Sequence, residues 1–278
     1  MRPDEVAEAE ECARTALNGH DSPPEPAQPA RGRRRVAHLQ ATDPGGAWVA
    51  EHRGRIAGLA MALVREGIWG LSLFAVAPEL QNRGIGRRLL EASYEYGRSA
   101  RGHLILSTES PAAMRRYARL GLELRPCVSA AGVVDPARLD RDAALDGVRD
   151  AGPDGIPVAD AIGRAVRGAG HGPDLESVLG DPGTRLVLVE DRAFAVVRPD
   201  RVVLLAGRDE DAATRVLNGA LASIPRGGSV TVDFLTAGQD WAVRACLDAG
   251  LAMSPDGPFF TGGDVGPLRP YVPSGAYL

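Results

Sequence analysis

The order of apolar and polar residues along the chain predicts strands and helices in two successive runs. Residues 3–17 carry apolar side chains at helical spacing, and the proline-rich stretch from Ser22 to Pro29 is expected to form a mobile loop. Three strands are predicted next, at Ala47–Glu51, Ile56–Val64 and Ile68–Val76. The dipeptides Arg53-Gly54 and Glu66-Gly67 separate them as hairpin turns. This part of the chain therefore predicts an antiparallel meander.

The pattern then alternates between helix and strand. After Gly86 the apolar spacing becomes helical, and His103–Ser107 returns to strand character. Ser110 has the properties of a helix N-cap, Pro111 of a first helical residue, and Gly121 of a left-handed helix stop. The predicted order is three strands, a turn, a helix, a strand and a helix.

The second half of the chain repeats this order. Residues 126–154 are polar and irregular, so we place a domain boundary there and expect domains at 1–137 and 138–278. Strands are predicted at Leu186–Glu190, Ala193–Leu205 and Ser229–Phe234, and helices at Asp211–Ser223 and Trp241–Ala249. Around the last helix, Ala242, Arg244, Gly250 and Leu251 match Ala113, Arg115, Gly121 and Leu122 at a constant offset of 129.

Length and composition agree with two ordinary globular domains. The chain has 278 residues, 44% hydrophobic and 24% charged, which excludes disordered, collagenous and coiled-coil classes. The longest stretch without a charged side chain is Gly67–Pro78, shorter than the roughly 20 residues that a membrane helix needs. The N-terminus has no apolar signal core. We expect a cytoplasmic protein without a membrane partner.

The charged residues exclude several kinds of chemistry. All 32 basic residues are arginine, so a Walker A phosphate loop, a Schiff-base enzyme and a lysine general base are excluded. The net charge is −4, which argues against a nucleic-acid partner. The one dense basic run, Arg31 with residues 33–35, is interpreted as a solvated loop.

The cysteines and histidines suggest no disulfide framework and no metal site. Cys12, Cys127 and Cys246 are more than a hundred residues apart and are expected to be buried small side chains. The five histidines show no ligand spacing.

The turn between Val76 and the next helix carries the strongest chemical signal. Gly84 and Gly86 let successive backbone amides converge in front of a helix N-terminus, an arrangement that suits an anion such as a pyrophosphate. A dinucleotide-binding fold would need a third glycine where this chain has Leu89, and a parallel sheet. The alternative is a turn without a ligand.

The pattern Val76-x-Pro78-x-x-Gln81-x-x-Gly84-x-Gly86 resembles the acyl-CoA-binding motif of the GNAT superfamily of N-acyltransferases. The resemblance extends from about Val36 to Leu124 and is faint beyond. It implies an α+β fold of two tandem GNAT-like domains, each with a mixed, mostly antiparallel sheet flanked by helices. It also implies acetyl-CoA as the acyl donor, without a metal.

The resemblance assigns cofactor contacts along this segment. The implied pyrophosphate-binding backbone comprises Gln81, Asn82, Arg83, Gly84, Ile85, Gly86 and Arg87. Phe74 and Val76 would give main-chain hydrogen bonds to the pantetheine arm and the thioester carbonyl. Ser110 takes the place of a family asparagine, and either contacts the cofactor or serves only as a helix cap.

Acid and base candidates complete the site. Tyr117 occupies the position where many family members have a general acid, which would protonate the departing CoA thiolate; the alternative is a core tyrosine on an amphipathic helix. For the proton that the amine loses, the candidates are Glu51, His52, Glu66 and Glu109, with Glu109 weakly favoured. A chain of water molecules is the alternative.

The second domain is expected to be degenerate. Aligning the halves sets Gly84-Ile-Gly86 against Asp211-Ala-Ala213, preceded by Asp209 and Glu210, whose charges would repel a pyrophosphate. Cys246 stands in the tyrosine position. This domain is expected to cover apolar surface and to wall one side of the substrate cleft, and residues 266–278 are expected to pack against the protein.

These observations favour an N-acetyltransferase that transfers an acetyl group from acetyl-CoA to a primary amine of a small molecule by direct attack. The alternatives are a non-catalytic acyl-CoA sensor and an acetyltransferase of protein lysines or N-terminal amines. A homodimer is also considered.

Overall fold

The computed structural model describes residues 1–18 and 28–278. The chain divides into two compact units, residues 1–104 with Tyr277 and residues 105–276 with Leu278. Most of the proline-rich segment that the sequence predicts as a loop lies outside the described residues. Each unit is described by itself.

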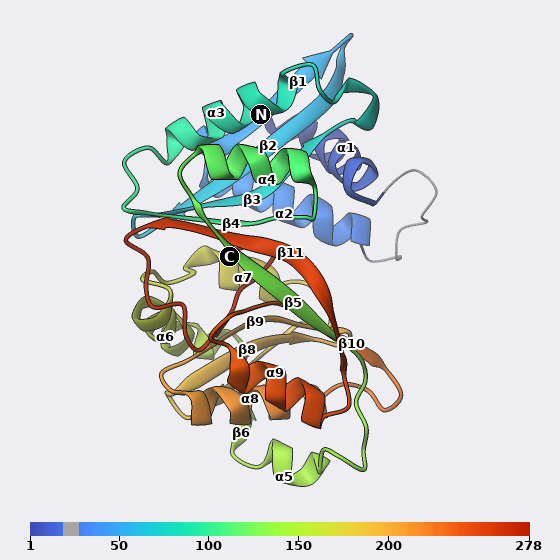
Figure 1. The fold of residues 1–278 in the computed structure, drawn as a ribbon, viewed down its shortest axis with the longest axis vertical. Helices are drawn as coiled ribbons and strands as arrows, with labels where there is room; N and C mark the ends of the chain where they lie inside the picture. Colours follow the sequence, from blue (N-terminus) through green and yellow to red (C-terminus); the bar gives the residue numbers. More distant parts are fainter. Residues whose placement is uncertain (19–27) are drawn as a thin grey trace. The chain divides into compact units, whose positions relative to one another are not determined.

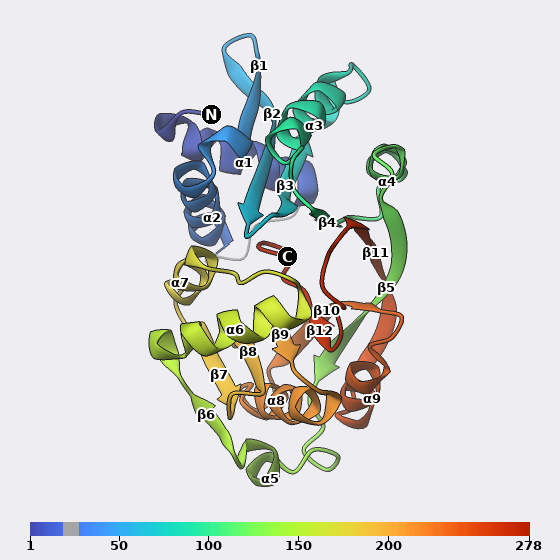
Figure 2. The same cartoon turned by 90° about the vertical axis from the view of Figure 1, so that its left-hand side faces the viewer.

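The first unit is a meander covered by helices. Its elements are the short turns η1 (Pro3–Glu5), η2 (Pro44–Gly46) and η3 (Pro78–Leu80), helices α1 (Val6–Asn18), α2 (Gln28–Thr42) and α3 (Ile85–Tyr96), strands β1 (Ala47–His52), β2 (Arg55–Arg65) and β3 (Ile68–Val76), and the first three residues of β4 (Gly102–Leu106). The strand order is β1-β2-β3-β4, with both hairpins antiparallel. Helices α1 and α2 cover one face and α3 the other (Figure 2). Accordingly, residues 59–63 of β2 are fully buried.

Helix α2 corrects the expectation of a solvated loop around Arg31. The basic run lies inside this helix, and Pro29 stands in its first turn, where a missing amide is tolerated. Val36 and Leu39, three residues apart, are fully buried and attach the helix to the sheet. Arg35 Nε donates to Ser72 Oγ on β3 at 3.0 Å. Two apolar anchors among arginines are a weak pattern, which is why the sequence did not predict the helix.

The second unit is a larger sheet with helices on both faces. Its helices are α4 (Pro111–Arg119), α5 (Arg141–Leu145), η4 (Gly152–Gly155), α6 (Ile156–Val166), α7 (Pro173–Leu179), α8 (Glu210–Ala222) and α9 (Asp240–Asp248); its strands are β5 (Glu123–Val133), β6 (Val148–Asp150), β7 (Arg185–Val189), β8 (Ala193–Arg198), β9 (Arg201–Gly207), β10 (Ser229–Thr236), β11 (Ala252–Gly263) and β12 (Tyr271–Val272). The order is β11-β5-β10-β9-β8-β7-β6, and β12 pairs with β9. Helices α6 and α8 lie on opposite faces of β8 and β9 (Figure 2), so almost every residue of β8 is buried.

The predicted repeat is confirmed, and it is more complete than the sequence indicated. The first copy runs α1, α2, β1, β2, β3, α3, β4, α4, β5 (Figure 1). The second runs α6, α7, β7, β8, β9, α8, β10, α9, β11 in the same order. Strand β12 has no counterpart in the first copy.

The compact units divide after residue 104, earlier than the boundary at residue 137 that the sequence predicts, and strand β5 lies between these two points. The sequence placed residues 126–154 in an irregular region, but β5 is an eleven-residue strand. It pairs antiparallel with β10 on one edge and with β11 on the other, and both are strands of the second copy. The boundary of the repeat and the boundary of the compact units therefore differ.

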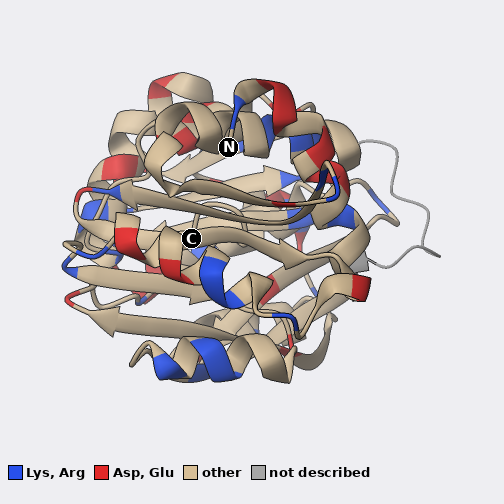
Figure 3. Cartoon of the chain, turned by 90° about the horizontal axis from the view of Figure 1, so that it is seen from above, with Lys and Arg blue, Asp and Glu red and all other residues tan. Residues whose placement is uncertain are grey.

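The structure shows where the charged residues and the cysteines lie and how apolar its described helices are. Positions of both signs are interspersed over the helices and loops (Figure 3). Cys127 and Cys246 are buried and Cys12 is half-buried, all three as free thiols. Among the described helices, none has the length and apolar character needed to cross a membrane.

Candidate functional site

The connection between β3 and α3 ends in an open helix N-terminus. Gly84 is the N-cap of α3 and adopts a left-handed conformation, with φ of +84°. Because it has no side chain, nothing in the residue itself caps the helix, and a Cβ there would meet nothing within 4 Å. Asn82, two residues earlier, is also left-handed, with φ of +62°. These two residues turn the chain so that successive amides lead into the helix.

The amides of this connection fall into two groups. The Leu80 amide donates to the Ala77 carbonyl at 2.9 Å and the Gln81 amide to the Pro78 carbonyl at 3.3 Å. Gln81 is therefore not a free backbone donor, and its side chain donates to the Val76 carbonyl at 3.1 Å. Among the described residues, the amides of residues 82–87 have no hydrogen-bond acceptor. Those of residues 84–87 are the four orphan donors that an α-helix leaves at its start, and those of residues 82 and 83 precede them in the turn.

Three arginines flank these free amides in the sequence. Arg83, Arg87 and Arg88 are all exposed. Arg87 lies 3.8 Å from Glu91, and neither Arg83 nor Arg88 has an ion-pair partner in the described part of the chain. Together with the positive end of the helix dipole, they supply positive charge of the kind that a multiply charged anion requires. The donor set fits a diphosphate, which accepts several hydrogen bonds at once.

Strand β3 leads directly into this turn. Phe74 and Val76, the predicted partners of a pantetheine arm, are half-buried and pair with Ala60 and Gly58 of β2. A Cβ on Gly58 would lie 2.8 Å from the Ala75 carbonyl and 3.1 Å from the Leu89 side chain. The missing side chain therefore lets α3 pack closely on the end of β3, which brings the strand end and the free amides together.

Ser110 and Tyr117 belong to the second unit. Ser110 caps α4, with its hydroxyl accepting from the Ala113 amide at 3.4 Å. Tyr117 is 4% exposed, and its ring meets that of Phe260 edge-on at 5.4 Å. Burial raises the pKa of its phenol well above the usual range, so the group is protonated at neutral pH. This packing agrees with the alternative that Tyr117 is a core residue of an amphipathic helix. The role of Tyr117 as a general acid stays a prediction.

The candidates for the base do not gather at one place. Glu51 and His52 are exposed at the end of β1 that lies toward the Val76 end of β3. Glu66 stands in the β2–β3 turn, separated from Val76 by the whole of β3, about 25–30 Å of strand. Glu109 is exposed in the second unit. Geometry therefore disfavours Glu66.

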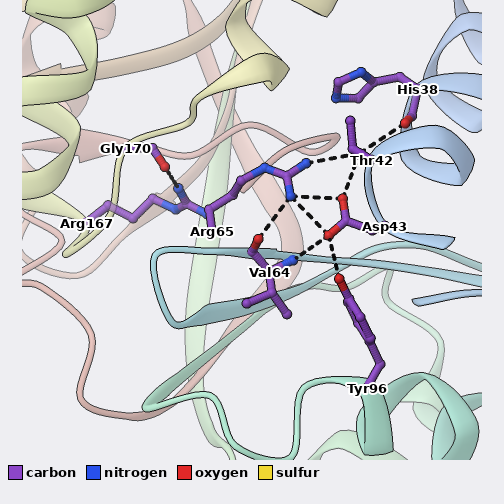
Figure 4. Close-up of polar contacts among 8 residues, drawn as sticks. All are labelled: His38, Thr42, Asp43, Val64, Arg65, Tyr96, Arg167 and Gly170. Carbon is purple, nitrogen blue, oxygen red and sulfur yellow. Dashed lines mark hydrogen bonds and ion pairs between the residues drawn. The ribbon is translucent and has the colours of Figure 1, made fainter. Parts of the chain in front are cut away.

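A buried polar cluster in the first unit escaped the sequence analysis. Asp43 is 1% exposed, and its carboxylate accepts from Arg65 at 2.8 Å, from the Tyr96 hydroxyl at 3.0 Å and from the Val64 amide at 3.0 Å (Figure 4). Burial, reinforced by the Asp43 charge, raises the pKa of Tyr96 to about 12. The cluster ties the C-terminal end of α3 to β2, and thereby orients the helix whose N-terminus carries the free amides.

The equivalent helix start in the second copy is closed. Asp209 is the N-cap of α8, and its carboxylate accepts from the Ala212 amide at 2.9 Å. Arg192 binds the same carboxylate through Nε and Nη2, at 3.1 and 2.8 Å. The Ala212 amide first, and then Arg192, lower the pKa of Asp209. Asp209, rather than Asp211, therefore takes the place of Gly84, which corrects the sequence alignment by two residues.

Comparison with known proteins agrees with this geometry. Residues 13–122 match the model of the acetyltransferase (GNAT) family. This part of the chain is therefore similar to a GNAT acetyltransferase domain. A search of curated proteins gives no match.

Solved structures share the tandem GNAT fold at low sequence identity. A Pyrococcus horikoshii protein described as an acetyltransferase superposes over 100% of this chain and 94% of its own, with 16% identity and a TM-score of 0.80. A GCN5-related N-acetyltransferase from Kribbella flavida covers 95% of this chain and 70% of its own, with 16% identity and a TM-score of 0.60. A tandem GNAT protein from the clavulanic acid biosynthesis pathway covers 94% and 95%, with 16% identity and a TM-score of 0.52. At this identity the likeness establishes the fold.

Proposed function

We propose that the protein transfers an acetyl group from acetyl-CoA to a primary amine of a small molecule, by direct attack of the amine on the thioester. The first copy carries the cofactor site and the second copy does not bind CoA. One observation supports this assignment above all others: α3 begins with free amides and a bare Gly84, whereas α8 begins with its own carboxylate.

The free amides would hold the diphosphate of the cofactor. Donors at residues 82–87 and the positive helix end supply several charge-assisted hydrogen bonds, and Arg83 and Arg88 add charge without first breaking an ion pair. Gly84 lets the backbone approach the phosphates closely. Phe74 and Val76 on β3 would bind the pantetheine arm along the strand.

The reaction requires two proton movements. The amine nitrogen forms a bond to the carbonyl carbon, the carbon–sulfur bond breaks, and the sulfur receives a proton. We assign that proton to the Tyr117 hydroxyl, which is protonated at neutral pH. The proton that the amine loses passes to solvent water, and the Tyr117 phenolate regains a proton from solvent before the next turnover.

The substitution Gly84→Asp tests the cofactor site. It places a carboxylate at the N-cap of α3, as Asp209 does in α8, and the charge should repel the diphosphate. We expect calorimetric titration to show CoA binding by the wild type and none by Gly84→Asp. Gly84→Asn, similar in shape but uncharged, should retain part of the affinity. Gly227→Asp is the matched control, since Gly227 has a similar φ of +75° and open space around it.

Acetyl transfer is tested by release of thiol from acetyl-CoA across a panel of small amines and peptides. Turnover with small amines supports the proposal. CoA binding without turnover on any amine would favour a sensor, and turnover on peptides alone would favour a protein acetyltransferase. If the control Gly227→Asp loses CoA binding as Gly84→Asp does, the turn before α3 has been wrongly assigned as the cofactor site.

A further inference from the structure

The chain places one of its own segments on β9 of the second copy. Strand β12 pairs antiparallel with β9, with Tyr271 opposite Ala206 and Val272 opposite Leu205. The Gly207 amide continues this pairing by donating to the Pro270 carbonyl at 3.3 Å. We call residues 266–272 the C-terminal strap.

The strap lies on the edge of β9 that faces β10. Strand β8 pairs with β9 along its whole length and takes the other edge. Strand β10 pairs with β9 only at Arg201 and Val202. A strand has only two edges. The strap therefore pairs with the C-terminal part of β9 on the edge that β10 leaves unpaired.

This position corresponds to the cofactor strand of the first copy. Counted back from their C-terminal ends, Leu205–Gly207 of β9 match Phe74–Val76 of β3. The latter are the residues to which the proposed function assigns the pantetheine arm, so the comparison rests on that proposal. The strap makes main-chain contacts with all three matching residues of β9.

The diphosphate position is filled as well. In the first copy, residues 77–84 separate β3 from α3; in the second, only Arg208 and Asp209 separate β9 from α8. The loop that would surround a diphosphate is absent, and the Asp209 carboxylate binds the helix amide in its place.

We infer that the second copy is permanently self-liganded: the strap replaces the pantetheine arm and Asp209 replaces the diphosphate. The strap is a fixed structural part of the second copy, and the chain binds one CoA.

Side-chain and backbone anchors hold the strap in place. Gln239, at the start of α9, is 3% exposed; its amide nitrogen donates to the Leu268 carbonyl at 2.7 Å and its oxygen accepts from the Tyr271 amide at 3.1 Å. The Gly266 amide donates to the Arg167 carbonyl at 2.9 Å. A Cβ on Gly266 would lie 2.3 Å from the Val166 carbonyl oxygen, so only glycine fits there. Tyr271 and Val272 are buried, which removes their side chains from water.

The number of CoA molecules bound per chain is the first test. Calorimetry should give one site in the wild type and none in Gly84→Asp. Two sites in the wild type, or one remaining site in Gly84→Asp, would overturn the inference. Absence of binding in the wild type would instead count against the proposed function.

Hydrogen exchange measured by mass spectrometry tests the position of the strap even if the wild-type protein does not bind CoA. Peptides covering residues 203–207 and 268–272 should exchange slowly and equally with and without CoA. Gly266→Ala should accelerate exchange in both peptides, whereas Gly227→Ala, at a turn outside the strap, should not. Fast exchange in the wild type, or protection lost on adding CoA, would show that the strap is displaced and contradict the inference.

Discussion

Cys127 and Asp256 are paired across β5 and β11, and each occupies the same position in its own copy of the repeat. Their numbers differ by 129, the offset that relates the final helices of the two copies. The last strand of the first copy, β5, thus pairs with two strands of the second copy, which is an exchange of one strand between the copies.

This exchange predicts that a fragment of residues 1–137 does not fold as a monomer. In such a fragment β5 would lose both β10 and β11, leaving two strand edges unpaired. We expect an insoluble or oligomeric product by size-exclusion chromatography with light scattering. Co-expression with residues 138–278 should restore a soluble complex. A monomeric fragment with cooperative thermal unfolding would contradict the exchange.

The cap of α8 predicts a stability effect without a catalytic one. Asp209→Ala removes an N-cap and its contact with Arg192, which should cost about 1 kcal/mol and lower the melting temperature by about 2–4 °C. Because the folded pKa of Asp209 is lowered, its contribution is present above about pH 4 and is lost as the pH falls through the folded pKa. The difference between wild type and variant should therefore shrink in acid. Asp200→Ala, at an exposed turn, is the control for calorimetry.

The role proposed for Tyr117 predicts a selective loss of rate. Tyr117→Phe keeps the ring contact with Phe260 and removes only the hydroxyl. We expect kcat to fall by about 10²–10⁴, the usual contribution of a general acid, with unchanged affinity for CoA. The control is Tyr94→Phe, on a partly exposed tyrosine of α3. An unchanged kcat in Tyr117→Phe would show that Tyr117 is a core residue and not the general acid.

The exposed arginines predict a salt-sensitive cofactor affinity. Arg83→Gln removes a charge that has no ion-pair partner in the described chain, so its effect should appear in binding rather than in stability. We expect the Kd for CoA to rise about fivefold to tenfold, equivalent to about 1–1.4 kcal/mol, and the salt dependence to weaken. Arg226→Gln, on an exposed turn in the second unit, should change neither.

Local patterns were sufficient to predict the elements that lead into the proposed site. Strands β1 to β3 have long apolar runs between glycine turns, and α4 has its cap, proline and glycine stop in sequence. The glycine turn before α3 was predicted from the same local signals. The open N-terminus of that helix followed because a glycine N-cap has no side chain to fill it.

Other features depend on partners far away in the chain. Strand β5 is exposed or half-buried at most positions and contains Pro126, so its own pattern is weak; β10 and β11 decide its structure. Strand β12 has two residues, too few for any periodicity. The buried Asp43 looks like an ordinary turn aspartate until Arg65 and Tyr96 are brought to it by folding.

That cluster predicts how the first unit responds to alkaline pH. The folded protein keeps the Tyr96 proton to about pH 12, whereas an unfolded chain releases it near pH 10. Between these values the unfolded state binds fewer protons, so rising pH lowers the free energy of unfolding. Tyr96→Phe loses one hydrogen bond, about 1 kcal/mol at neutral pH, but lacks this alkaline penalty. Urea unfolding at pH 7 and pH 11 should show a smaller difference from wild type at the higher pH. The control Tyr94→Phe should keep the wild-type dependence, and a difference that grows with pH would mean that Tyr96 ionises readily in the folded state.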